Sequence, residues 1–365
     1  MKNAGAVPFV CNTIDIYLHL LYHGIACEKS RTQKGNVSMS EHVNVCEYIE
    51  SNCVRVEADC FDIEQIMESG QCFRIYKLSL QEQEKFCKSN GLEDCESMTW
   101  YRVMAADKKV FVCQNGVHLI FFCSKEEYKQ FWCHYFDLDF DYRSYEKAID
   151  ADDNYLKSAF AYGSGIRILN QDPWEMLITF IISQRKNIPA IRQAVEALSK
   201  ACGTCIDKEN ELYAFPTPTQ LSGLSLSDLQ DLSLGYRAKY VYEAAQKAAS
   251  GELDIKQWAM LDDDDLHKAL LSCYGVGEKV ANCVALFGYH RIGAFPVDVW
   301  IDRIQKTYYN GSFPVEKYEG FAGVMQQYMF YYERKMATDH SKKHVNSRKN
   351  RIIHTYFIQN LALSP

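Results

Sequence analysis

A glycine turn, a lysine and a distant carboxylate stand out in the stretch CYGVGEKVANCVALFGYHRIGAFPVDVW. Gly275 and Gly277 flank Val276, Lys279 follows two residues later, and Asp298 comes directly after Phe-Pro-Val. Glycines permit a close backbone approach, and free N–H groups at the start of the next helix favour an anion. Lysine can act as a nucleophile, and aspartate as a proton acceptor. Taken singly, Lys279 also fits a surface lysine and Asp298 a helix N-cap.

Helices are predicted to position these residues. Asp172 fits an N-cap, Pro173 a first helical position and Glu175 the third, ahead of a nearly continuous apolar run. This run predicts the central, buried helix of an α-helical unit. Apolar spacing predicts further helices over 187–201, 226–233, 237–250, 263–272, 278–288, 299–309 and 318–335.

The preceding part of the chain has the period of β-strands. Residues from about 55 to 125 alternate apolar and polar, and Asn115-Gly116 signals a two-residue hairpin. An antiparallel sheet with flanking helices is therefore expected. The predicted segments are a weakly patterned extension (1–50), a sheet domain (51–150), an α-helical domain (151–335) and a basic tail (336–365).

Composition limits the classes of function. With 365 residues, 47% of them hydrophobic, and a net charge of −7, the chain does not suit indiscriminate coating of nucleic acid. Its 15 cysteines are scattered and odd in number, which favours reduced thiols in an intracellular protein. The run Val7–Cys27 is amphipathic, so neither an export signal nor a membrane span is expected. The pair Cys202 and Cys205 lacks partners for a zinc site, and no metal is predicted.

The motifs resemble those of a known enzyme family. LLSCYGVGEKVANCVALFG followed by FPVDVWIDRI resembles the helix-hairpin-helix and Gly-Pro-Asp signature of base-excision DNA glycosylases, and KVANC resembles the 8-oxoguanine branch. SGQCFRI, NQDPWEMLITFIIS, LGYRAKYV and FAGVMQQYMF occur in that family's order. The resemblance covers roughly residues 55–335.

This resemblance implies an α+β fold and a DNA partner. An N-terminal antiparallel sheet domain of the TATA-binding-protein type is expected before an all-α helix-hairpin-helix glycosylase domain. The expected partner is damaged double-stranded DNA, bound by a monomer without membrane or cofactor. No cysteine follows Cys283, which excludes the iron–sulfur cluster of the endonuclease III branch. The expected location is the nucleus in a eukaryote, or the cytoplasm and nucleoid in a bacterium.

By resemblance, Lys279 is the nucleophile at C1′ and Asp298 the carboxylate beside the sugar. A free lysine has a pKa of about 10.4, so the neutral amine is scarce at pH 7. A helix N-terminus contributes only about 0.3–1 kcal/mol to lowering the pKa of this amine. Desolvation is therefore expected to cause most of the decrease in pKa. The Schiff base that follows can lose a C2′ proton and break the 3′ phosphate bond, which gives a glycosylase with lyase activity.

The resemblance also assigns base and DNA contacts. Gly70 occupies the position whose carbonyl accepts the N7 hydrogen of 8-oxoguanine. Gln326 binds the base edge, while Phe330 and Cys283 cover its two faces. Contacts to DNA are assigned to Asn187, Tyr236, Arg237, Gly275, Val276 and Gly277. Tyr236 is the expected wedge and Arg237 the reader of the partner base.

The chain departs from the family in one loop. Animal members of the family carry three consecutive asparagines in this loop, whereas this chain reads Gln184, Arg185, Lys186 and Asn187. Ala190 occupies the position at which a second cytosine-reading arginine is usual. A weaker preference for cytosine opposite the lesion is therefore expected. Two alternatives stay open, namely an alkylated-base (3-methyladenine type) glycosylase and a non-catalytic hairpin module that binds DNA backbone. Lys279 and SGQCF speak against the first of these.

Overall fold

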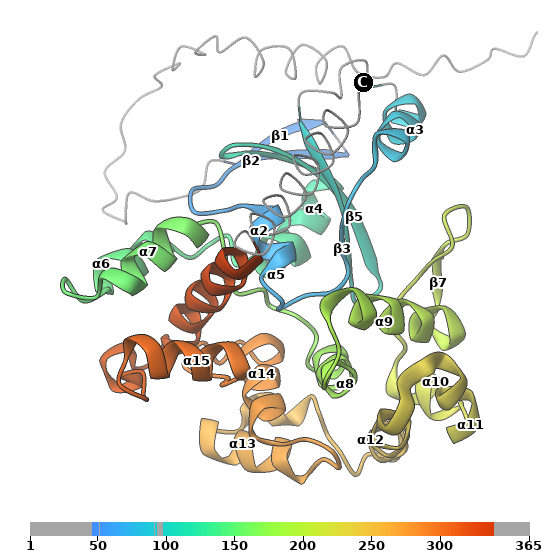
Figure 1. The fold of residues 1–365 in the computed structure, drawn as a ribbon. Coiled ribbons are helices and arrows are strands. Elements are labelled where there is room, and N and C mark those ends of the chain that lie inside the picture. The colour runs from blue at the N-terminus through green and yellow to red at the C-terminus, as the bar shows by residue number, and fades with distance from the viewer. Residues whose placement is uncertain (1–45, 51, 91, 93–97, 339–365) are drawn as a thin grey trace, which may run out of the picture.

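A computed structural model describes residues 46–50, 52–90, 92 and 98–338. The predicted amphipathic run Val7–Cys27 and residues 339–365 of the predicted tail lie outside the described residues. The β-sheet and its covering helices occupy one side of the molecule, and the helices from α8 onward occupy the other (Figure 1).

The described residues form a six-stranded antiparallel sheet of order β1-β2-β6-β5-β4-β3. Its strands are β1 (Cys46–Glu50), β2 (Cys53–Glu57), β3 (Ile75–Lys77), β4 (Thr99–Ala105), β5 (Lys108–Asn115) and β6 (His118–Phe122). β1 falls within residues 1–50, so the sheet begins before the predicted boundary at residue 50. The predicted β5–β6 hairpin is present. Its turn is Gly116-Val117, one residue later than predicted, because Asn115 pairs with His118.

Both faces of the sheet are covered, as the alternating pattern requires. The covering helices are α2 (Ile63–Glu68), α3 (Leu80–Asn90), α4 (Lys125–Glu127) and α5 (Cys133–Tyr135). On one face Val56 packs in a cluster with Ile66 of α2. On the other face Trp100 and Ile120 pack with Phe86 of α3. Close packing on both faces thus holds the sheet in a fixed position.

The rest of the described chain is mainly helical. Its helices are α6 (Arg143–Ala148), α7 (Asn154–Gly163), α8 (Pro173–Ser183), α9 (Ile188–Cys202), α10 (Pro218–Ser222), α11 (Leu226–Leu229), α12 (Ala238–Ser250), α13 (Asp263–Ser272), α14 (Glu278–Gly288), α15 (Val299–Tyr308) and a last helix over 322–338. α8 is central, as predicted. The Asp172 side chain accepts from the Glu175 N–H at 2.8 Å, and Phe180 stacks on Phe287 of α14 with ring centroids 5.5 Å apart.

Two local features were not expected from the sequence. A ribbon of β7 (Cys205–Asp207) and β8 (Leu212–Tyr213) interrupts the domain that was predicted to be all α-helical. The predicted helix 226–233 is regular only through α11, because Ser233 adopts a left-handed φ of 59° in the turn that follows. That turn directs the chain into residues 235–237.

The segment from Ser69 to Arg74 joins the two halves. The buried Gln71 side chain donates to the Arg167 carbonyl at 2.8 Å and accepts from the Leu169 N–H at 2.9 Å. The Arg74 Nε lies 2.9 Å from a carboxylate oxygen of Glu196 in α9. These long-range bonds fix the turn at Gly70 against the helical half.

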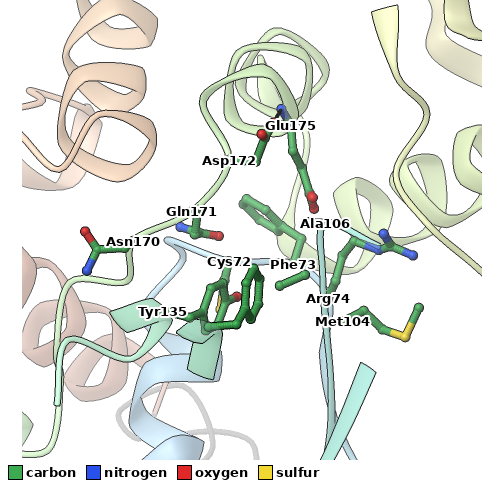
Figure 2. Close-up of a pocket in the computed structure, with 12 residues that line it drawn as sticks. Cys72, Phe73, Arg74, Met104, Ala106, Tyr135, Asn170, Gln171, Asp172 and Glu175 are labelled. Atoms are coloured by element: carbon green, nitrogen blue, oxygen red, sulfur yellow. Dashed lines mark hydrogen bonds between the residues drawn. The ribbon is translucent and has the colours of Figure 1, made fainter. Parts of the chain in front are cut away.

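A small polar cavity of about 190 Å³ lies in this junction. Figure 2 shows the Glu175 side chain extending from α8 toward Arg74, with Tyr135 also in the lining. Burial raises the pKa of the Glu175 carboxyl to about 7. The Arg74 guanidinium opposes this rise in pKa, and the carboxylates of Asp172 and Glu196 reinforce it.

Glu175→Gln is expected to stabilise the chain at pH 8 and to change its stability little at pH 5. The raised pKa means that the folded state binds the proton more tightly than the unfolded state. Glu175 therefore makes the free energy of unfolding decrease as the pH rises from about 4.5 to 7. The full effect is on the order of 3 kcal/mol, from a rise in pKa of about 2.5 units.

Denaturation of both proteins at pH 5 and pH 8 measures this difference. Glu146→Gln, at an exposed position on α6, is the matched control and should give the same small change at both pH values. Equal pH dependence for the Glu175 and Glu146 variants would contradict the prediction.

Two further observations concern the whole described chain. No helix within the described ranges has the length and apolar character needed to cross a membrane. Cys202 and Cys205 of the CGTC motif are free thiols. Cys87 is disulfide-bonded, which departs from the expectation that all thiols are reduced.

Candidate active site

One cavity of about 890 Å³ collects residues from distant parts of the sequence. It is lined by the Gly70 turn, the loop between α8 and α9, α14, α15 and the last helix. Five predicted site residues line it together, namely Gly70, Asn187, Lys279, Asp298 and Phe330. The cavity has the size of pockets that enclose small organic groups. Lys279 and Asp298, 19 residues apart, thus share one cavity.

The glycine turn joins α13 to α14 beside this cavity. Gly275 has a φ of 85°, and a Cβ there would lie 2.4 Å from Cγ of Tyr240, so only glycine fits without displacement. Gly277 is the N-cap of α14, has no side-chain capping bond and faces open space. Val276 is buried and anchors the turn. The first N–H groups of α14 are therefore accessible to an anion.

Lys279 lies in the first turn of α14 and is exposed in the DNA-free chain. The sequence led us to expect that desolvation makes the neutral amine available, and in the DNA-free chain this side chain is in contact with water. The first turn of a helix that borders an open cavity keeps its side chains in contact with water. Any desolvation of Lys279 has to come from what fills the cavity.

Asp298 is the N-cap of α15, as one reading of the sequence predicted. Its Oδ1 accepts from the N–H groups of Trp300 and Ile301 at 2.9 and 3.0 Å. Both bonds use the same carboxylate oxygen. The second oxygen remains available to the cavity, so capping and a chemical role are compatible in one residue.

Gly70 and Phe330 meet at the side of the cavity formed by the last helix. Gly70 has a φ of 81°, and a Cβ there would lie 3.1 Å from a ring carbon of Phe330. The neighbouring carbonyl of Glu68 accepts from Nη1 of Arg334 at 3.0 Å. The Arg334 guanidinium also lies over the Phe330 ring, 5.1 Å from its centroid. The turn and the ring are therefore held against each other.

Cys283 and Gln326 lie behind this cavity instead of lining it. Burial raises the pKa of the Cys283 thiol to about 12, with Lys279 opposing the shift and Asp298 reinforcing it. Cys283 is thus an un-ionised thiol near both residues. The Gln326 side chain donates to the Pro296 carbonyl at 3.2 Å and accepts from Gln327 at 3.0 Å. These bonds use one of the two N–H donors and one of the two acceptor sites of the Gln326 amide.

The predicted DNA contacts outside the cavity fall into two groups. Tyr236 is 47% exposed, as a wedge residue must be. Arg237 is buried, and its guanidinium donates to the carbonyls of Gln184 and Leu234. These bonds hold the Arg237 guanidinium in the DNA-free chain, and its predicted contact with a partner base stays a prediction. Asn187 accepts from the Ala190 N–H at 3.0 Å and caps α9.

Sequence reasoning assigned no role to two arginines of the cavity. Arg334 and Arg185 both line it. Arg334 stands four residues after Phe330, so helical spacing could have indicated that the two side chains are neighbours. Arg185 was noted only as a departure from a family pattern. The charged lining consists of Arg185, Lys186, Lys279, Asp298, Asp302 and Arg334.

The arrangement of these groups suits attack on an electron-poor sugar carbon within a chain of phosphates. A lysine amine and a carboxylate share a cavity, cations line it, and a helix start beside it is open to a phosphate. Residues 53–177 match the family described as 8-oxoguanine DNA glycosylase, N-terminal domain. Residues 178–316 match the HhH-GPD superfamily of base excision DNA repair proteins.

Individual relatives agree with these matches. A probable N-glycosylase/DNA lyase of Methanothermobacter thermautotrophicus is 30% identical over 230 residues, which cover 55% of this chain and 73% of the relative. The N-glycosylase/DNA lyase of Saccharomyces cerevisiae is 38% identical over 161 residues, which cover 40% of this chain and 43% of the relative. The Clostridium acetobutylicum 8-oxoguanine glycosylase/lyase, solved with DNA containing cytosine opposite 8-oxoguanine, is 31% identical. Its TM-score is 0.72, with 82% of this chain and 100% of that chain covered.

Fold, site and relatives together define a base excision DNA glycosylase of the helix-hairpin-helix class. Within that class the chain belongs to the 8-oxoguanine DNA glycosylase family, whose members combine N-glycosylase and DNA lyase activities. The sequence-based recognition of the family, the fold class and the enzyme class is confirmed.

Proposed function

We propose that this chain excises 8-oxoguanine from duplex DNA and then cuts the strand at the abasic site. The cavity shared by Lys279 and Asp298, next to Gly70 and Phe330, is the observation that carries the proposal. Membership of the 8-oxoguanine glycosylase family supports the choice of damaged base. The extruded nucleotide enters the cavity at a cost of a few kcal/mol for unstacking.

Lys279 acts as the nucleophile. Bound DNA fills the cavity and removes water from the exposed amine, which favours its neutral form. The amine attacks C1′, and the electron pair of the C1′–N9 bond leaves with the base. The free oxygen of Asp298 stabilises the positive charge that develops on the sugar and accepts the proton of the amine. The C1′–O4′ bond of this adduct then opens as the nitrogen electron pair forms the C=N bond of the Schiff base and O4′ takes a proton. Loss of a C2′ proton and β-elimination break the C3′–O bond.

Base selection rests on the Gly70 turn and the Phe330 ring. The Gly70 carbonyl accepts the N7 hydrogen that 8-oxoguanine has and guanine lacks. Leaving a single buried donor or acceptor unpaired costs about 1–3 kcal/mol, so this contact can discriminate against guanine. Contact of Cys283 and Gln326 with the base requires side chains of the cavity wall to move when DNA binds, because neither residue lines the cavity in the DNA-free chain.

Release of free base from duplexes with a central 8-oxoguanine tests the proposal. We expect release of 8-oxoguanine together with strand cleavage, and none from the same duplex with guanine at that position. Release of 3-methyladenine from a methylated duplex, with no release of 8-oxoguanine from the first duplex, would indicate an alkylated-base glycosylase. Duplex binding without any base release would indicate a module that only binds DNA backbone.

A further inference from the structure

The small polar cavity at the junction of the two halves, which we call the junction cavity, lies apart from the candidate active site. Its volume is about 190 Å³, and it is lined by residues 72–74, the end of β4 over 104–106 and the start of α8. Phe131 and Asn170 also line it and are only half-buried. The junction cavity is therefore accessible from the surface.

Arg74 brings an unsatisfied hydrogen-bond donor to this cavity. The residue is only 2% exposed. Its Nε and Nη2 donate to the Glu196 carboxylate, and Nη2 also donates to the Tyr213 carbonyl. Its Nη1 has no hydrogen-bond partner among the described residues. Since an unpaired buried donor costs about 1–3 kcal/mol, a molecule in the cavity is expected to accept from Nη1.

Glu175 brings an acceptor to the same space. Its side chain extends from α8 toward Arg74 (Figure 2), and the residue is 7% exposed. Within the part of the chain that the structure describes, no hydrogen bond or ion pair engages its carboxyl group, not even one with Arg74. Guanidinium and carboxyl group therefore border one gap that a ligand can bridge.

The charges around the junction cavity favour a neutral ligand. An anion would be repelled by the carboxylates of Asp172 and Glu196, which act on Glu175 strongly enough to raise its pKa. A cation would be repelled by the Arg74 guanidinium. A neutral group with an acceptor beside a donor avoids both penalties, because it can accept from Arg74 Nη1 and donate to the Glu175 carboxyl group.

Aromatic side chains favour a flat ring. Phe73, Met104 and Phe131 line the cavity, and the rings of Phe131 and Tyr135 are stacked with centroids 6.0 Å apart. A cavity of about 150 Å³ in another protein holds benzene, so the junction cavity admits one six-membered ring. In a flat six-membered lactam, the N–H donor and the C=O acceptor lie side by side on one edge of the ring.

We propose that the junction cavity binds a neutral six-membered lactam, the chemical class to which the free bases uracil and thymine belong. The lactam C=O accepts from Arg74 Nη1, the N–H donates to Glu175, and the ring packs on Phe73. Phe73 also lines the cavity of Lys279 and Asp298. The ligand therefore contacts a side chain that both cavities share. Binding at this site does not depend on the proposed function.

Titration of the full chain with 2-pyridone, followed by NMR of ¹³C-labelled methionine methyl groups, tests the inference. Met104 lines the cavity, and Met104→Leu identifies its signal. We expect 2-pyridone to shift this signal saturably, with a Kd on the order of 1 mM for so small a ligand. 1-Methyl-2-pyridone lacks the N–H donor and should bind at least about tenfold more weakly, because it leaves Glu175 unpaired.

Two variants of Glu175 separate hydrogen bonding from apolar packing. Glu175→Leu removes the acceptor and should weaken binding of 2-pyridone at least about tenfold. Glu175→Gln keeps an acceptor oxygen and should bind 2-pyridone as the parent chain does. If Glu175→Leu does not fold, the comparison of the two pyridones on the parent chain decides the question.

Three results would overturn the inference. Without a saturable shift of the Met104 signal, the cavity takes up water alone. Equal binding of the two pyridones, or undiminished binding by a folded Glu175→Leu variant, would mean that the ring packs without the proposed hydrogen bonds. Shifts confined to other methionines would place the ligand elsewhere on the chain.

Discussion

Lys279→Gln is expected to abolish covalent trapping of the chain on 8-oxoguanine DNA by borohydride. Reduction captures a Schiff base, and glutamine has no amine with which to form one. Base release should fall by at least about three orders of magnitude, because loss of a covalent nucleophile costs on the order of 10⁶-fold in a well-studied protease. Lys279 is exposed, so the variant should fold normally. Trapping yield and single-turnover base release measure the two effects.

A control variant distinguishes the nucleophile from lysines in general. Lys268 is exposed on α13, close in sequence to the glycine turn, and pairs with Asp265 at 2.8 Å. Lys268→Gln should retain trapping and base release. Trapping that persists in Lys279→Gln would move the nucleophile to another amine. Lys186, which lines the same cavity, would be the next to test.

Local sequence patterns predicted the features that depend on local backbone geometry. Asp172 and Asp298 were predicted as N-caps, and both cap their helices through bonds to residues two or three positions away. Both glycines of the turn can adopt a positive φ by residue type; Gly275 does so, whereas Gly277 has a φ of −111°. Such features need only near neighbours in the chain, so residue type and spacing suffice to indicate them.

Long-range partners explain where the DNA-free structure places Arg237 and Gln326. The Arg237 guanidinium donates a hydrogen bond to the Gln184 carbonyl, 53 residues earlier in the chain. The Gln326 amide donates one to the Pro296 carbonyl, 30 residues earlier. No local pattern shows that these carbonyls lack other donors. A buried carbonyl without a donor is costly, and the nearest long polar side chain satisfies it. A residue type that suits DNA recognition is therefore not evidence that its donors are free.

The exposure of Lys279 also depends on parts of the structure that are distant in the sequence. A motif fixes where the amine is along the chain, but its contact with water depends on what occupies the cavity. In the DNA-free chain the Lys279 side chain is exposed to water in the cavity. The expected desolvation of its amine requires a bound nucleotide. The sequence could thus predict which group reacts, while the conditions for its reaction arise only in the complex with DNA.

Asp298→Asn is expected to separate the two roles of this residue. Asparagine caps helices about as well as aspartate, so the bonds to the N–H groups of Trp300 and Ile301 can persist. The negative charge beside the sugar is lost, and base release should fall by about 10²- to 10⁴-fold. Thermal stability should change little. Asp298→Ala removes the cap as well and should cost about 1 kcal/mol of stability in addition.

A cap without a proposed chemical role provides the comparison. Asp262 caps α13 by accepting from the Asp265 N–H at 2.9 Å. Asp262→Asn should leave base release unchanged, because its carboxylate lies outside the cavity lining. If Asp298→Asn matched Asp262→Asn in rate, the carboxylate would only be a cap. A large loss of rate at unchanged stability would instead show that the charge of Asp298 acts on the reacting sugar.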